Sequence, residues 1–400
     1  SVFDKGTAYA VFDGHTQNDM NPYAYKTTDF GKTWKSIITE GIDGFVRNIQ
    51  EDYVNPDLLF LGTEFGLYIT LDGGQNWKKF TNNMPSVAVH HIELQKTTND
   101  LVMGTHGRGV IIIDDISPLR ELNAEVMDKT LHFFKSKPTV INEETSFSGN
   151  FGTETQFVGQ NATKNAQIKY YLKKRHTFGK MTMEIQDMEG NKIIEIGPGK
   201  SKGINIVNWG GTLKQPKIAK GKTFSFGGFT SPKVPAGTYK AVLTKGKETY
   251  EHSFDLVYDQ RSPLTPDERI FKNETTMKMY NMTQELAYVV YELDKMIAKA
   301  TVDTNSKMVA KLNTLKETLV VTTGDNYVGA AEPQLREKMA DLYSKLADNY
   351  DKPSSAEMEN LMVISERFET AKADFAKLKK KFKTKERMEL MTFDEFLESN

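Results

Sequence analysis

A turn motif that ends in tryptophan occurs twice near the start of the chain, and it constrains the fold more than any other feature. The sequence TTDFGKTW at 27–34 recurs as TLDGGQNW at 70–77, which is 43 residues later. A second landmark agrees, since LGTE at 61–64 recurs as MGTH at 103–106, which is 42 residues later. One four-stranded blade of a β-propeller occupies about 40–45 residues. We therefore expect residues 1–118 to fold as successive propeller blades.

Each copy of the motif has a physical logic. The aspartate can accept backbone N–H bonds across a turn, the glycine allows the backbone to bend, and the tryptophan can pack between sheets. These residues are therefore expected to be structural rather than functional. They are Thr27, Asp29, Gly31 and Trp34 in the first copy and Thr70, Asp72, Gly74 and Trp77 in the second. The complete repeat predicts strands over 45–52, 58–63, 66–71 and 77–80.

The pattern Ser/Thr-x-Asp-x-Gly-x-x-Trp resembles the Asp-box, or bacterial neuraminidase repeat, of sialidases, xyloglucanases and sortilin-type propellers. The chain is similar to the C-terminal part of sortilin-like or "glycosyl hydrolase-like" bacterial proteins over roughly residues 1–260. The resemblance implies a propeller but no particular function, because the box lies away from the active centre in the families that share it. Such proteins are commonly exported, so the resemblance implies an extracytoplasmic location in the periplasm, at the cell surface or outside the cell.

The chain supplies too few strands for a closed propeller. Residues 2–39 account for three strands, 44–80 for a whole blade and 87–116 for three more strands, whereas closure typically takes four to eight blades. Ser1 is also not a usual translation start. We expect N-terminal blades to be missing and to belong to the same polypeptide or to a cleaved partner chain, since the fragment alone would leave sheet faces open to water.

Two further domains are expected. Residues 119–260 alternate strands and turns like an antiparallel β-sandwich, and the VPAGTY segment at 234–239 resembles immunoglobulin or fibronectin-III-like modules. Residues 265–400 carry four apolar stripes at helical spacing, beginning at the capping box of Thr265, and indicate an antiparallel α-helical bundle. A long coiled-coil hairpin is the alternative. The stripes are expected to form the core, although a stripe that docks on a protein partner would look the same.

Charge and composition exclude several classes of protein. Lys and Arg number 52 against 53 Asp and Glu, so no overall field attracts nucleic acid or anionic lipid. The basic run at 377–387 is better explained by the preference of positive charge for a helix C-terminus than by a polyanion site. No apolar run approaches the ~20 residues of a membrane span. The chain has no cysteine, which excludes disulfides and thiolate chemistry.

No metal site and no cofactor are expected. His90 and His91 are adjacent in an expected strand, so their side chains should point to opposite faces. The glycine-rich segment at 104–109 precedes an apolar strand rather than a helix, which argues against a dinucleotide site.

The candidate ligand residues lie in the turns between the second and third strands of each blade, which open on one face of a propeller. They are Asp13, His15, Glu64, His106 and Arg108. Arg108 can bind a carboxylate through two parallel hydrogen bonds, and Asp13 or Glu64 can act as a base. The alternative is that these turns are polar only because they face water.

Two functions follow from this pattern. The first is a non-catalytic ligand-binding or scaffolding protein whose propeller funnel holds a peptide, protein or glycan, acting in an exported or cell-envelope assembly. The second is a glycan-cleaving hydrolase that uses Asp13 and Glu64 as its two carboxylates. A sialidase is disfavoured, because it would need three arginines where only Arg108, and more distantly Arg47, are present.

Overall fold

The computed structural model describes residues 1–141, 163–323, 331–349, 351–382 and 388–399. Contacts along the chain divide it into two compact units. The first comprises Ser1–Lys135, Lys169–Gly179 and Gly199–Ile206, and the second comprises Ser136–Ile168, Lys180–Pro198 and Val207–Asn400.

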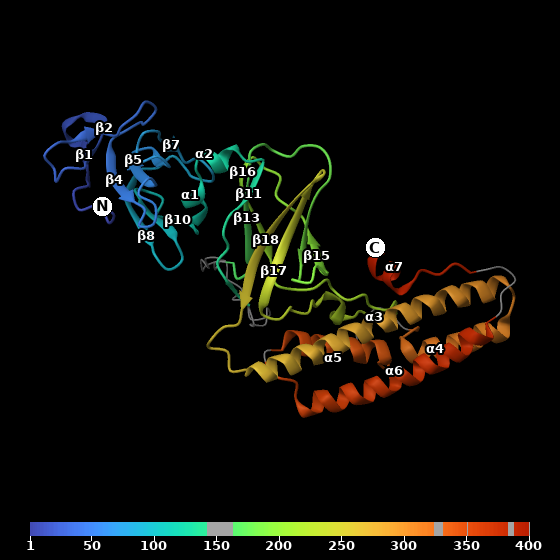
Figure 1. Cartoon of the computed structure of the whole chain (residues 1–400). Coiled ribbons are helices and arrows are strands. Elements are labelled where there is room, and N and C mark those ends of the chain that lie inside the picture. Colours follow the sequence, from blue (N-terminus) through green and yellow to red (C-terminus); the bar gives the residue numbers. More distant parts are fainter. Residues whose placement is uncertain (142–162, 324–330, 350, 383–387, 400) are drawn as a thin grey trace. The chain divides into compact units, whose positions relative to one another are not determined.

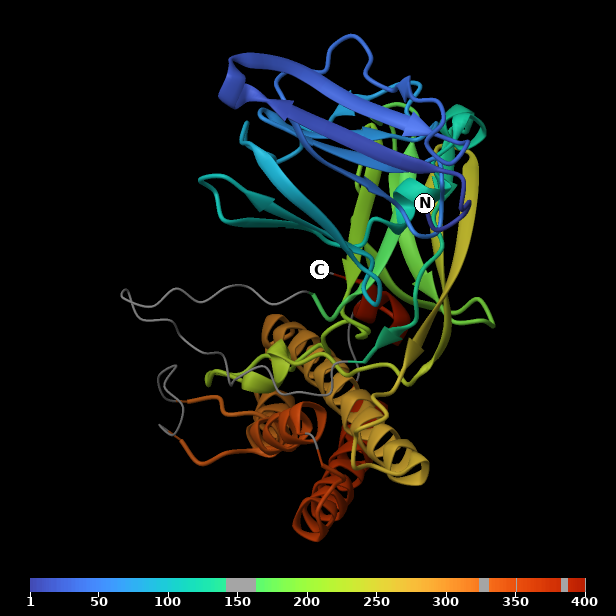
Figure 2. The same ribbon diagram turned by 90° about the vertical axis from the view of Figure 1, so that its left-hand side faces the viewer.

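The first unit opens with three small antiparallel sheets that follow one another in chain order (Figures 1 and 2). The first sheet contains β1 (Ala8–Gly14), β2 (Asp19–Thr27) and β3 (Lys35–Ser36). The second contains β4 (Val46–Glu51), β5 (Leu59–Thr63), β6 (Gly66–Thr70) and β7 (Lys78–Lys79). The third contains β8 (Val89–Gln95), β9 (Asp100–Thr105) and β10 (Val110–Ile113). The strands of the second sheet fall inside the four ranges that the repeat predicts, which confirms that part of the prediction.

Alternating side chains of these sheets form two apolar layers. The layer between the first and second sheets includes Ala24, Leu61, Tyr68 and Trp77. The layer between the second and third sheets includes Phe60, Leu67, Ile92 and Met103. Because successive side chains of a strand point to opposite faces, the second sheet contributes to both layers. The three sheets make an incomplete, open half-barrel.

The outer face of the first sheet has no covering layer among the described residues of its unit. Ala10, Tyr25 and Trp34 occupy the positions that Leu61, Tyr68 and Trp77 occupy in the second sheet. Trp77 is 6% exposed, and its Nε1 donates to the Ile37 carbonyl of the preceding segment at 2.8 Å. Trp34 is 45% exposed. The same side chains are therefore buried where another sheet lies against them and open where none does.

The two repeated turns are held by matching hydrogen bonds. The Thr70 hydroxyl donates to Asp72 at 2.7 Å, and the Asp72 carboxylate accepts the backbone N–H of Asn76 at 2.8 Å. In the first copy, Thr27 donates to Asp29 at 2.8 Å, and Asp29 accepts the N–H of Thr33 at 2.9 Å. Bonds from the Thr33 hydroxyl and backbone and from Thr27 lower the pKa of Asp29 to about 2. These contacts suit a structural role of the motif.

Two short helices follow the three sheets, α1 (Ser117–Glu121) and α2 (Ala124–Asp128). Helix α1 is joined to the second sheet by a buried ion pair, in which Arg120 donates to the carboxylate of Asp52 at 2.7 and 2.9 Å.

Two more sheets follow. One has the spatial order β11 (Leu131–Phe133), β13 (Ala166–Leu172) and β16 (Gly203–Trp209). The other has the order β12 (Thr139–Val140), β18 (Glu248–Val257), β17 (Gly237–Lys245), β14 (Met181–Gln186) and β15 (Lys192–Ile196). Trp209 is buried, with its ring 5.5 Å from Tyr239 and 5.9 Å from Phe254. Trp209 thus serves as a core residue.

The C-terminal part of the second unit is helical (Figure 1). Its helices are α3 (Pro266–Val302), α4 (Ser306–Leu319), α5 (Leu335–Asp348), α6 (Ser355–Lys381) and α7 (Phe393–Glu398). The expected capping box at Thr265 is confirmed, since Thr265 and Glu268 exchange side-chain and backbone bonds. Helices α3 to α6 share one apolar core, which includes Met279, Leu293, Leu312, Met339 and Phe368. Among the described helices, none combines the length and hydropathy that a bilayer crossing requires.

Candidate functional site

The residues expected to bind a ligand lie at one end of the three sheets in the first unit. Asp13 lies at the end of β1, and its carboxylate is 2.6 Å from Nδ1 of His15 in the following 3₁₀ turn, His15–Gln17. Its other oxygen is 2.8 Å from Nε of Arg47 in β4. This second contact is an ion pair and not an aligned hydrogen bond, because the buried Nε–H of Arg47 does not point at an acceptor. Asp13 therefore joins the first sheet to the second.

Three irregular strand positions direct side chains to this end of the sheets. The pairing of β1 with β2 shifts between Phe12 and Gly14, where the extra residues lie on β2 opposite Asp13. The pairing of β4 with β5 shifts around Arg47, and the pairing of β8 with β9 shifts around His90. Arg47 and His90 are 43 residues apart, which is the period of the repeat. A β-bulge re-aims one side chain and is common beside functional sites.

Aromatic contacts continue the cluster across the sheets. The His15 ring stacks on Phe45 with centroids 4.6 Å apart, and the Arg47 guanidinium lies 5.5 Å from the same ring. In the third sheet, His90 stacks on His106 with centroids 5.2 Å apart. We call Asp13, His15, Arg47, His90 and His106 the rim cluster.

Two of the expected residues are less closely tied to this cluster. The Glu64 backbone N–H donates to the Phe45 carbonyl at 3.0 Å, but its carboxylate has no ion pair among the described residues. Arg108 is exposed, and it likewise has no ion-pair partner in the part of the chain that the structure describes. The structure therefore groups Asp13, His15 and His106 with Arg47 and His90, and it leaves Glu64 and Arg108 as adjacent polar side chains with free charges.

Burial and charge set the protonation of the cluster. Burial opposes ionisation of Asp13, but the bonds from His15 and the charge of Arg47 outweigh it, so the pKa of this carboxyl lies below its usual range. Burial, followed by the positive charges of Arg47 and His106, lowers the pKa of His90. At neutral pH, Asp13 is ionised and His90 is neutral.

The lowered pKa of His90 predicts a pH dependence of stability. The unfolded chain takes up a proton on His90 near pH 6.5, whereas the folded chain does so only at lower pH. The free energy of unfolding should therefore fall as the pH drops below 6.5, and this component should vanish in His90→Gln. Urea unfolding of both proteins at several pH values measures the difference, and identical pH profiles would contradict the assignment.

Sequence reasoning did not include Phe45 or His90 in this site, and it gave Arg47 only as a more distant arginine. It assumed regular alternation, which sends adjacent side chains to opposite faces, whereas the bulges redirect one residue in each strand. The cluster offers the Arg47 guanidinium and aromatic rings beside one carboxylate, which is a chemistry of recognition. Among the described residues, no group of three or more His, Asp, Glu or Cys side chains is close enough to hold a metal ion.

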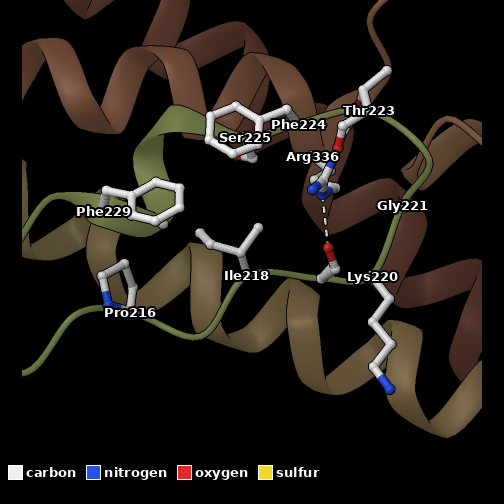
Figure 3. Close-up of a pocket in the computed structure, with 11 residues that line it drawn as sticks. Pro216, Ile218, Lys220, Gly221, Thr223, Phe224, Ser225, Phe229 and Arg336 are labelled. Atoms are coloured by element: carbon white, nitrogen blue, oxygen red, sulfur yellow. Dashed lines mark hydrogen bonds between the residues drawn. The ribbon is translucent and has the colours of Figure 1, made fainter. Parts of the chain in front are cut away.

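A hollow in the second unit is formed where the segment between β16 and β17 lies against α5 (Figure 3). Phe224 and Phe229 stack with centroids 5.3 Å apart, and Ile218 faces them across the hollow. Arg336 of α5 is buried at one side, where it donates to the Ala219 carbonyl at 2.7 Å and to Glu337 at 2.6 Å. Glu337 thus balances the charge of Arg336. The bond to Ala219 ties the segment between β16 and β17 to α5. The hollow offers an aromatic surface rather than a cationic one.

Comparisons with known proteins give local likenesses only. No family model matches the sequence, and no curated protein matches it. Solved β-propeller structures are similar in part. PorZ, a surface component of the type-IX secretion system of Porphyromonas gingivalis, is 13% identical over 64% of this chain and 29% of PorZ, with a TM-score of 0.23.

The GH74 xyloglucanase of Xanthomonas campestris is 12% identical over 64% of this chain and 37% of the enzyme, with a TM-score of 0.24. YCF48 bound to D1 peptide is 12% identical over 58% of this chain and 60% of YCF48, with a TM-score of 0.18. The chain thus spans less than two thirds of the length of each of these proteins. At such TM-scores the likenesses carry no argument about function, which has to rest on the geometry of this chain.

Proposed function

We propose that this chain is a non-catalytic ligand-binding or scaffolding protein whose binding site is the rim cluster. The observation that carries the proposal is the set of three irregular strand positions in consecutive sheets. They bring Asp13, Arg47 and His90 to the same end of the unit, with Asp13 already paired to His15 and Arg47. Side chains that are held in place before a ligand arrives lose little entropy on binding.

The chemistry of the cluster favours a ligand with a carboxylate, on a peptide, a protein or a glycan. The negative charge of Asp13 is already offset by its neighbours. Arg108 has no such partner among the described residues, so its guanidinium remains available for a bidentate bond. Phe45 supplies an aromatic face beside the charges.

A glycan-cleaving hydrolase that uses Asp13 and Glu64 is the alternative. Such an enzyme needs one carboxyl group that stays protonated near neutral pH to act as the acid. Asp13 does not meet this requirement, because its bonds to His15 and the charge of Arg47 lower its pKa. Glu64 would then have to act as the acid and Asp13 as the nucleophile or base. The bonds to Asp13 weaken it in both roles, so binding without turnover is favoured.

The test compares binding and hydrolysis with one set of proteins. Binding of carboxylate-bearing peptides and glycans is measured by calorimetry, and Arg47→Met should raise the dissociation constant about tenfold or more. Lys32→Met is the control, since Lys32 lies in the repeated turn at the opposite end of the sheets. Hydrolysis of the same glycans that is abolished by Asp13→Asn or Glu64→Gln would establish the alternative instead. Equal binding by wild type and Arg47→Met would remove the rim cluster from the proposal.

We also propose that further blades complete the propeller, either in the same polypeptide or in a partner chain. Support comes from the outer face of the first sheet, where Ala10, Tyr25 and Trp34 repeat the pattern of side chains that the second sheet buries against the first. A sheet with the same type of turn would cover them in the same manner.

The remaining organisation is proposed from the pattern of elements. Residues 1–118 would be propeller blades, 119–260 an immunoglobulin or fibronectin-III-like β-sandwich, and 265–400 an antiparallel helical bundle. A protein partner is proposed at the helical bundle, and the stacked Phe224 and Phe229, on the segment that lies against α5, offer an apolar surface beside it. The resemblance to the Asp-box proteins supports an extracytoplasmic location in a cell-envelope assembly.

A further inference from the structure

Two neighbouring loops of the first unit concentrate positive charge on a chain whose net charge is −1. They span 173–179 and 199–203, and neither contains an acidic residue. Lys173 is neutralised by Asp128 at 2.7 Å. Four cationic side chains of these loops are exposed and have no ion pair among the described residues. We call these four side chains the basic loops' cations. They are Lys174, Arg175, Lys200 and Lys202.

The two loops are held together and held in shape. The backbone N–H of His176 donates to the Lys200 carbonyl at 2.9 Å. The Tyr170 hydroxyl donates to the Gly199 carbonyl at 2.5 Å. The buried side chain of Asn205 accepts from the Ser201 N–H at 3.0 Å and donates to the Ser201 carbonyl at 2.8 Å. The backbone segments that carry the charges are thus held together on one surface.

An apolar side chain projects from this surface. Phe178 is 88% exposed, the highest exposure among the large apolar side chains of the described residues. Its turn is closed by a contact of 3.1 Å between His176 Nε2 and the Gly179 carbonyl, and Gly179 adopts a φ of +88° that few other residues tolerate. Single exposed apolar residues are common. Phe178 differs because it lies at the tip of a turn whose neighbours are all cationic or polar.

We propose that these loops bind the surface of an anionic phospholipid membrane. The basic loops' cations would lie against the phosphate groups, and Phe178 would insert at the boundary between headgroups and acyl chains. Each Lys or Arg near an anionic surface contributes about 1 kcal/mol, and an inserted aromatic side chain adds its apolar burial. An anionic polysaccharide in solution would use the cations equally well, but it has no hydrocarbon interior in which Phe178 could be buried. The combination therefore favours a membrane.

The experiment measures co-sedimentation of the 400-residue chain with vesicles of phosphatidylcholine, with and without phosphatidylglycerol. Binding should require phosphatidylglycerol and weaken with salt. Replacing Lys174 and Arg175 together by glutamate should raise the dissociation constant about thirtyfold or more, since each lost cation accounts for about fivefold. Phe178→Ser should raise it about tenfold. The matched control replaces Lys380 and Lys381 by glutamate, because these residues are also exposed and basic but lie on α6 without an apolar tip.

Three outcomes would overturn the proposal. The first is an absence of binding to either vesicle, and the second is equal loss of binding in the control. The third is an unchanged affinity of Phe178→Ser together with competition by heparin, which would assign the loops to an anionic polymer. Circular dichroism of each variant separates loss of binding from loss of folding, and the exposed positions chosen should leave folding intact.

Discussion

Replacing Arg120 by methionine is expected to lower the free energy of unfolding of the first unit by about 3–5 kcal/mol. The reason is the environment of Asp52, which is completely buried. Arg120 donates to both oxygens of this carboxylate and also to Asn99 at 2.9 Å. Methionine fills much of the same volume, but it leaves Asp52 as a buried charge with only the backbone N–H groups of Val54 and Asn55 as donors.

The measurement uses the distribution of tryptophan in the chain. In a Trp209→Phe background, the remaining tryptophans Trp34 and Trp77 both lie in the first unit, so their fluorescence follows its unfolding in urea. Arg108→Met is the control, because it removes an exposed arginine from the same unit and should change stability by less than about 0.5 kcal/mol. A loss below about 1 kcal/mol for Arg120→Met would show that the buried pair is not needed.

A double variant separates the charge from the packing. Asp52→Asn combined with Arg120→Met removes the unpaired charge, so it should be more stable than Arg120→Met alone. If the double variant is instead the less stable of the two, Asp52 stabilises the unit through the backbone N–H groups of Val54 and Asn55 even without Arg120. The comparison therefore separates the cost of the unpaired Asp52 charge from the cost of losing the Arg120 side chain.

The repeat predicted the sheets well because its period reflects a whole structural unit. The turn around Asp72 predicted where β6 ends and β7 begins, and the period then predicted the same turn around Asp29. Asp52 and Arg120 lie 68 residues apart and belong to no motif, so their pairing could be found only from coordinates. Local patterns indicate local structure, whereas a buried pair depends on how distant segments meet.

The candidate site was predictable only in part, for a related reason. Turn positions suggested Asp13, His15 and His106, because loops between strands are recognisable in sequence. Arg47 and His90 lie inside strands, and nothing in a strand sequence marks a bulge. One signal was available, since Arg47 and His90 are separated by the 43-residue period, and polar residues at equivalent positions of two repeats are a reason to consider them together.

The basic loops illustrate the limit of a whole-chain charge count. Equal totals of acidic and basic residues exclude an overall field but say nothing about one corner of the molecule. The loop at 173–179 and the loop at 199–203 are separated in sequence and share a surface only because His176 bonds to Lys200. The expectation that no overall field attracts anionic lipid concerns the net charge alone, so the local surface has to be tested separately.

The second large effect concerns two tryptophans at equivalent positions of the repeat. Trp77→Ala should lower the free energy of unfolding by about 3–5 kcal/mol, because it removes a buried ring and leaves the Ile37 carbonyl without its donor. Trp34→Ala should change it by less than about 1 kcal/mol, since the Trp34 ring is half open to water. Far-UV circular dichroism in urea measures both, and hydrogen exchange of β5 and β6 localises the loss for Trp77→Ala.

The difference between the two variants tests the open face directly, since each tryptophan is the control for the other. If no other sheet covers the first sheet, Trp34 packs against no second layer. Trp34→Ala should then change the free energy of unfolding little in every form of the protein. If another sheet covers it, Trp34 should become protected from acrylamide quenching when that sheet is present, and Trp34→Ala should then cost about as much as Trp77→Ala. A large effect of Trp34→Ala in this chain alone would contradict the inference that this face of the first sheet is open. The Trp34 ring would then have to make stabilising contacts despite its exposure of 45%.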